Sequence, residues 1–148
     1  MIHLIEKSWK SISEFGSVYF YLFIVAFMYL FNYKNFAVIL FYSLIVSYVV
    51  SISIRSVYFK DRPKKQKHDN WIDKLDASSF PSMHTMRIAI LFVMFTKFFG
   101  RYDLGMLFLA MTVIVAVSRS VVKKHFWTDI IAGFFFGLII GQVMFTLL

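Results

Sequence analysis

The chain has 148 residues, of which 59% are hydrophobic and 20% aromatic, while only 16% are charged. Soluble domains carry about 25% charged residues, so this composition excludes an ordinary soluble protein and indicates an integral membrane protein. The net charge of +8 is carried between apolar runs, which favours phospholipid headgroups or another anionic ligand over nucleic acid. With no cysteine, the chain can form no disulfide, thiolate nucleophile or cysteine-ligated metal site.

The first 14 residues are predicted to form an amphipathic helix at the membrane interface. Apolar side chains recur there at helical spacing, whereas Lys7 and Lys10 fall on another face. A secretory signal is rejected, because no small-residue cleavage site follows the next apolar run. The apolar positions are Ile2, Ile5, Trp9 and Ile12.

Five apolar runs follow, and each is predicted to be a transmembrane helix, since a span needs about 20 residues. We therefore expect an all-α, polytopic membrane helix bundle with about five transmembrane helices plus the N-terminal interfacial helix. It should form a single integral-membrane domain over residues 1–148. The runs are Phe15–Phe31, Phe36–Ile54, Ser82–Phe99, Leu104–Ser118 and Ile130–Leu148.

The last run carries Gly133, Gly137 and Gly141 at four-residue intervals. Such a row allows a neighbouring helix to approach closely. We expect it to pack inside the bundle, although it could also serve a homodimer.

Three polar clusters stand at the ends of these runs, and counting the crossings places all three on one side of the membrane. In the third cluster, His125 and Asp129 are four residues apart and share a helix face. A carboxylate beside an imidazole orients the ring and leaves one nitrogen free to attack, while Arg119 can clamp an oxyanion. This pattern predicts a nucleophilic histidine that acts on a phosphate.

The other two clusters supply anion-binding groups. Arg55 and Arg62 could close on one phosphate from different directions, because a guanidinium binds phosphate oxygens bidentately. The segment Pro81-Ser82-Met83-His84 opens a helix, where free N–H groups favour an anion and His84 could protonate a leaving alkoxide. Most lysines of the intervening loop, Arg55–Phe80, are interpreted as solvated.

Together the clusters resemble the type 2 phosphatidic acid phosphatase superfamily, whose pattern is K-x6-R-P, P-S-G-H and S-R-x5-H-x3-D. The resemblance covers roughly residues 36–145, with the order and internal spacings kept. It implies that His125 forms a phosphohistidine, that Asp129 orients it, and that His84 protonates the departing oxygen and then activates water. It also implies that no metal or other cofactor is needed. The implied phosphate-binding groups are Arg55, Arg62, Ser82, the Met83 N–H and Arg119.

Two motif positions depart from the family pattern. Arg55 replaces lysine, and Met83 replaces glycine, where methionine would be strained if the loop needed a positive φ. The resemblance also implies six spanning helices where we count five.

The resemblance implies a membrane lipid phosphatase that acts on phosphatidate, phosphatidylglycerophosphate, a polyprenyl pyrophosphate or a lipid A phosphate. Two alternatives remain open: a metal hydrolase with His84, His125 and Asp129 as ligands, and an inactive anion-binding or transport protein. The expected partners are a phosphorylated lipid and the bilayer, in the cytoplasmic membrane of a prokaryote. Counting basic residues favours a cytoplasmic site, but the resemblance favours the extracytoplasmic side, which we expect.

Overall fold

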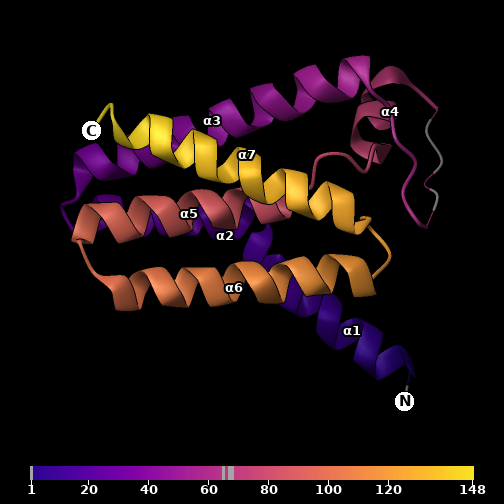
Figure 1. The fold of residues 1–148 in the computed structure, drawn as a ribbon, viewed down its shortest axis with the longest axis horizontal. Helices are drawn as coiled ribbons and strands as arrows, with labels where there is room; N and C mark the ends of the chain where they lie inside the picture. The colour runs from indigo at the N-terminus through magenta and orange to yellow at the C-terminus, as the bar shows by residue number, and fades with distance from the viewer. Residues whose placement is uncertain (1, 65, 67–68) are drawn as a thin grey trace.

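The computed structural model describes residues 2–64, 66 and 69–148, with side chains from Lys7 onward (Figure 1). The side chains of Ile2 and Ile5 therefore lie outside the described residues. The described chain is all-helical. Its elements are α1 (Ile2–Ser13), the 3-10 helix η1 (Glu14–Gly16), α2 (Val18–Leu30), α3 (Lys34–Val57), α4 (Trp71–Ala77), α5 (Met83–Phe99), α6 (Tyr102–Val121) and α7 (Trp127–Phe145).

All five expected apolar runs are helical, but the expected count of five spans is not confirmed. By length and composition, α3, α6 and α7 could each cross a membrane, and the bent pair Lys7–Gly16 and Val18–Leu30 could make a fourth span. The helix α2 is only 13 residues long, about 20 Å at 1.5 Å per residue. It is short because Ser17 breaks the run and caps α2 by accepting a hydrogen bond from the Phe20 N–H.

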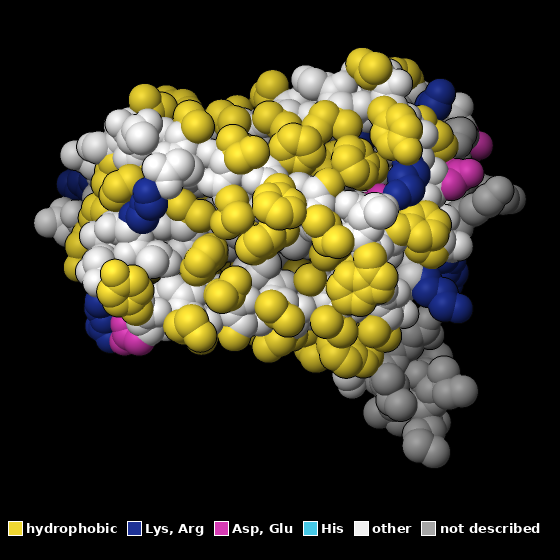
Figure 2. Space-filling view, viewed as in Figure 1, with side chains coloured by type: hydrophobic (Ala, Val, Ile, Leu, Met, Phe, Trp, Pro, Cys, Tyr) yellow, Lys and Arg dark blue, Asp and Glu magenta, His cyan; other side chains and the backbone are white. Residues whose placement is uncertain are grey.

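The helix α5 lies at the centre of the bundle and packs against α3, α6 and α7 (Figure 1). Its side chains Met86, Ile90, Leu91 and Met94 are fully buried. The surface around the bundle is rich in apolar side chains, and the charged ones gather at its two ends (Figure 2). That distribution is typical of a protein embedded in a bilayer.

The glycine row of α7 faces α5 of the same chain. A Cβ at Gly137 would lie 2.5 Å from the Met86 carbonyl oxygen, and one at Gly141 would lie 2.9 Å from the Val93 Cβ. The predicted close approach of a neighbouring helix is therefore confirmed. Because α5 of the same chain already occupies this row, the row packs inside the bundle, and a homodimer through it is not shown.

The three polar clusters meet at one end of the bundle. The end of α3, the start of α5, the end of α6 and the start of α7 all lie there (Figure 1). At the opposite end, α5 stops at Gly100, whose left-handed backbone (φ 60°) turns the chain into the antiparallel α6. We call the end at which the three polar clusters meet the site end.

Candidate active site

His125 lies in the short turn between α6 and α7. Lys123 adopts a left-handed conformation (φ 54°) after the last turn of α6. The N–H groups of Lys124 and His125 then both donate to the Arg119 carbonyl oxygen, at 3.1 and 3.3 Å. This turn folds the chain back over α6 and leaves the imidazole buried beside the arginine-bearing end of that helix.

The ring of His125 is held in one tautomer. Its Nδ1 lies 2.6 Å from the Ser79 carbonyl oxygen, which can only accept, so Nδ1 carries the proton and Nε2 keeps its lone pair. Burial, then the charges of Arg119, Arg62 and Arg55, lower the pKa of His125 well below its ordinary value, and the Ser79 contact opposes them only in part. The imidazole is therefore neutral near pH 7, the form that a nucleophile requires.

Asp129 is fully buried at the start of α7. Its Oδ2 accepts the Phe126 N–H at 2.8 Å, and its Oδ1 lies 2.5 Å from Lys60 Nζ. Its backbone oxygen accepts the Ser82 N–H at 3.0 Å. The described contacts thus tie Asp129 to its helix start and to the opening of α5. The expected shared helix face does not form, because α7 begins only at Trp127, and the His125 ring nitrogen expected to bond Asp129 is held by Ser79 instead.

Lys60 is a site-end residue that the sequence reasoning missed. Besides its ion pair with Asp129, its ammonium lies 4.8 Å from the centre of the Phe126 ring. The sequence favours solvated positions for most lysines of this loop, and Lys60 is an exception. Position alone offered one weak signal: Lys60 stands two residues before Arg62, inside the first motif.

Arg55 is buried and makes contacts that differ from those expected of a phosphate ligand. Its Nε and two terminal nitrogens donate to the carbonyl oxygens of Phe80, Leu75 and Pro81 at 3.0–3.3 Å. It therefore braces the segment that leads into α5. That Arg55 binds phosphate remains a prediction, and the structure shows that Arg55 also holds the segment before α5.

The departure at Met83 creates no backbone strain. Met83 is the first residue of α5. In the described chain, positive φ values occur only at Asn32, Lys123 and Gly100. Next to it, Ser82 is buried, with its hydroxyl 3.1 Å from that of Thr85.

Arg62 and Arg119 each keep a buried Nε without a hydrogen-bond partner. Arg62 otherwise contacts Gln66 and the Asp76 carbonyl, and Arg119 donates to the Ser13 hydroxyl at 3.3 Å. A buried, unpaired guanidinium N–H is costly. Both arginines therefore have a donor available for an anion.

His84 lies in the first turn of α5, close enough to Arg119 for the guanidinium charge to act on it. The segment η1 packs against it, since a Cβ at Gly16 would lie 2.8 Å from the His84 Cβ. The N-terminal segment thus forms one wall of the site.

No group of three or more histidine, aspartate or glutamate side chains that could hold a metal ion occurs within residues 2–64, 66 and 69–148. The structure thus gives the metal-hydrolase alternative no ready set of ligands. The positive charge at this end comes from arginine and lysine side chains.

Comparison with known families identifies the superfamily of the chain. The PAP2 superfamily model matches residues 36–148, about three quarters of the chain. The chain belongs to the PAP2 superfamily. No curated protein and no solved structure matches it. Members of the superfamily are generally phosphatases, and its membrane branch is consistent with the apolar helices. The matched region begins after α1, η1 and α2 and contains all three polar clusters.

Proposed function

We propose that this PAP2 protein is a metal-independent membrane phosphatase that removes a phosphate or pyrophosphate monoester from a lipid through a phosphohistidine at His125. Phosphatidate, phosphatidylglycerophosphate, a polyprenyl pyrophosphate and a lipid A phosphate are the candidate substrates. The observation that carries the proposal is the neutral His125, with Nδ1 held by Ser79, among arginines that keep unpaired donors.

In the first step, His125 Nε2 forms a bond to phosphorus while the bond from phosphorus to the lipid oxygen breaks. His84 gives its proton to the departing oxygen. Arg62 and Arg119 bind the phosphoryl oxygens and stabilise the charge that develops on them. The bound phosphate offsets the two arginine charges, and so it favours the protonated form of His84 that this step requires.

In the second step, neutral His84 takes a proton from water as the water oxygen attacks phosphorus. The phosphorus–nitrogen bond breaks, inorganic phosphate leaves, and His125 Nε2 regains its lone pair. The ion pair of Asp129 with Lys60 fixes the start of α7 to the loop after α3, and the carbonyl contacts of Arg55 fix the end of α3 to the segment that leads into α5. The two contacts with Asp129 and Arg55 therefore hold the elements that carry the site. We assign these three side chains a positioning role.

A groove between α6 and α7 supports a lipid substrate. It has a volume of about 290 Å³, and one of its lining residues is Thr85, which follows His84 in the chain. A tail that enters from the bilayer could lie there while its headgroup reaches His125. Apart from two threonines the lining is apolar: Thr85, Leu109, Thr112, Val113, Ala116, Trp127, Ile130, Ile131, Phe134 and Phe135.

We further propose that the site end faces the extracytoplasmic side of a prokaryotic cytoplasmic membrane. Because the chain has no cysteine, a single introduced cysteine reports on one position. A membrane-impermeant maleimide should label Lys64→Cys in intact cells, and should label Asn32→Cys at the opposite end only after lysis. The reverse pattern would place the site in the cytoplasm.

Phosphate release from a panel of lipid monophosphates and pyrophosphates tests the activity. The wild-type protein should release phosphate from at least one member of the panel, and His125→Ala should release none. Turnover retained by His125→Ala would overturn the nucleophile assignment. A wild-type protein that binds these lipids without releasing phosphate would instead support the inactive binding or transport alternative.

A further inference from the structure

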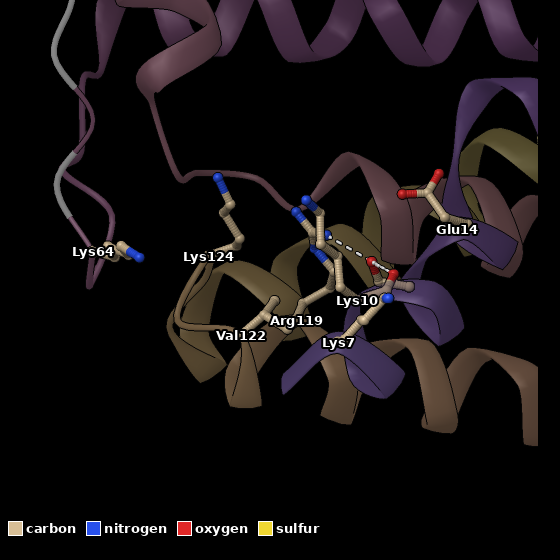
Figure 3. A pocket seen from close by; sticks show the side chains of 8 residues that line it. Lys7, Lys10, Glu14, Lys64, Arg119, Val122 and Lys124 are labelled. Carbon is tan, nitrogen blue, oxygen red and sulfur yellow. Dashed lines mark hydrogen bonds between the residues drawn. The ribbon is translucent and has the colours of Figure 1, made fainter. Parts of the chain in front are cut away.

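A pocket of about 560 Å³ opens at the site end, beside Arg119 (Figure 3). Its walls come from α1, from the loop after α3 and from the end of α6. Five cationic side chains line it, against one carboxylate, that of Glu14. The cations are Lys7, Lys10, Lys64, Arg119 and Lys124, and the remaining lining residues are Ser13 and Val122.

The charge of this pocket is not compensated within the described residues that line it. Arg119 is only 8% exposed, and its Nε has no hydrogen-bond partner. Burial, then the charges of Arg62 and Arg119, lower the pKa of Lys124, with Asp76 opposing them. Like charges held together raise the free energy of the site, and a bound anion relieves this repulsion.

The N-terminal segment supplies much of this charge, and it is fixed against the active site. Arg119 donates to the Ser13 hydroxyl at 3.3 Å, and Arg87 donates to the Gly16 carbonyl oxygen at 3.1 Å. Lys7 and Lys10 lie one to two turns before this junction, and they precede the region that matches the family. They therefore add to the family's motif residues rather than belonging to them.

We propose that this pocket binds a second phosphate group of the substrate, so that the preferred lipid carries two phosphates close together. This inference rests on the proposed function. One phosphate would react at His125 while Lys7, Lys10 and Lys124 hold the other. Arg119 belongs to both sites, and its guanidinium has five N–H donors with which to contact two phosphates.

The test measures binding to full-length His125→Ala protein in a neutral detergent, which excludes attraction to an anionic bilayer. The probes are a lipid methylenebisphosphonate and a lipid monophosphonate with the same tail. The bisphosphonate should bind more tightly. Each exposed lysine contributes about two- to fivefold in affinity, so adding Lys7→Ala and Lys10→Ala should lower the bisphosphonate-to-monophosphonate affinity ratio by about tenfold.

Lys34→Ala with Lys97→Ala is the matched control, because these lysines lie at the opposite end of the bundle and the charge change is the same. This pair should leave the affinity ratio unchanged. Thermal unfolding of each variant checks that it is folded, and Lys7 and Lys10 are exposed, so no buried contact is lost.

Equal affinity for the two probes, or an equal loss of affinity for both in the Lys7 and Lys10 variant, would overturn the second-phosphate site. The outcome is separate from that of the proposed function. A wild-type protein that hydrolyses lipid phosphates without a preference for the bisphosphonate probe contradicts only this inference. A clear preference without any turnover supports this inference and contradicts the phosphatase.

Discussion

Replacing Lys60 by methionine tests the partly buried ion pair that joins the loop after α3 to the start of α7. The change keeps a long apolar side chain and removes only the charge that faces Asp129. Asp129 is 0% exposed, and the Lys60 side chain is 25% exposed. Methionine would leave the carboxylate with the Phe126 N–H and the Thr128 hydroxyl as its partners.

The size of the effect follows from this partial burial. Breaking a fully buried pair costs about 3–5 kcal/mol, and an exposed pair contributes about 0.2–1 kcal/mol. For a pair with one buried and one partly exposed member, we expect Lys60→Met to lower the free energy of unfolding by about 2 kcal/mol. Phosphate release should also fall, because the backbone oxygen of Asp129 accepts a hydrogen bond from the N–H of Ser82, two residues before His84.

Reversible unfolding in mixed detergent micelles measures the free energy, with Lys74→Met as the matched control. Lys74 is an exposed lysine in the same polar segment, so its replacement should change stability by less than about 0.5 kcal/mol. Adding Asp129→Asn to Lys60→Met should recover part of the loss, since the unpaired charge is then gone. Equal stability of the Lys60→Met and Lys74→Met variants would refute the reasoning.

Three further predictions concern packing, protonation and the tail groove. Gly137→Ala should lower the free energy of unfolding by about 2 kcal/mol or more, because the new Cβ would meet the Met86 carbonyl oxygen at 2.5 Å; an unchanged unfolding midpoint would contradict the packing. Burial and neighbouring arginines lower the pKa of His125 below its ordinary value of about 6.5. The folded protein therefore binds fewer protons than the unfolded chain between these two values. Stability should consequently rise with pH through that window and fall on acidification below about pH 6.5, and the His125→Ala variant should show a weaker pH dependence than the wild type in the same unfolding assay. Finally, Ala116→Phe should fill the α6–α7 groove and reduce kcat/KM for a long-chain lipid phosphate about tenfold, but not for a short-chain one. Ile139→Phe on the exposed surface of α7 should affect neither substrate.

The sequence predicted the five apolar helices because each is an apolar run without an internal proline. It did not predict α4, a helix of seven residues inside the segment that was interpreted as a solvated loop. It predicted the meeting of the three clusters because helix direction alternates with each crossing. The number of spans was harder to predict, since one N-capping serine, Ser17, divides the first run and shortens α2.

The contacts within the site could not be read from motif spacing. The Arg55 guanidinium donates to three backbone carbonyl oxygens, and the His125 ring contacts a fourth, that of Ser79. Every residue carries a backbone carbonyl, so the sequence does not single out these partners. Lys60 differs from the other loop lysines only in its position after folding. The pocket beside Arg119 likewise depends on α1 folding back against α6, which no local pattern indicates.

Trapping the covalent intermediate tests the central claim most directly. The purified protein would be mixed with its best lipid phosphate substrate, quenched in base within milliseconds to seconds, and analysed by peptide mass spectrometry. We predict phosphate on His125, absent from His125→Ala and accumulating when His84→Ala slows hydrolysis of the intermediate. Phosphate attached to His84, or steady lipid dephosphorylation by His125→Ala, would contradict a mechanism in which His125 is the nucleophile.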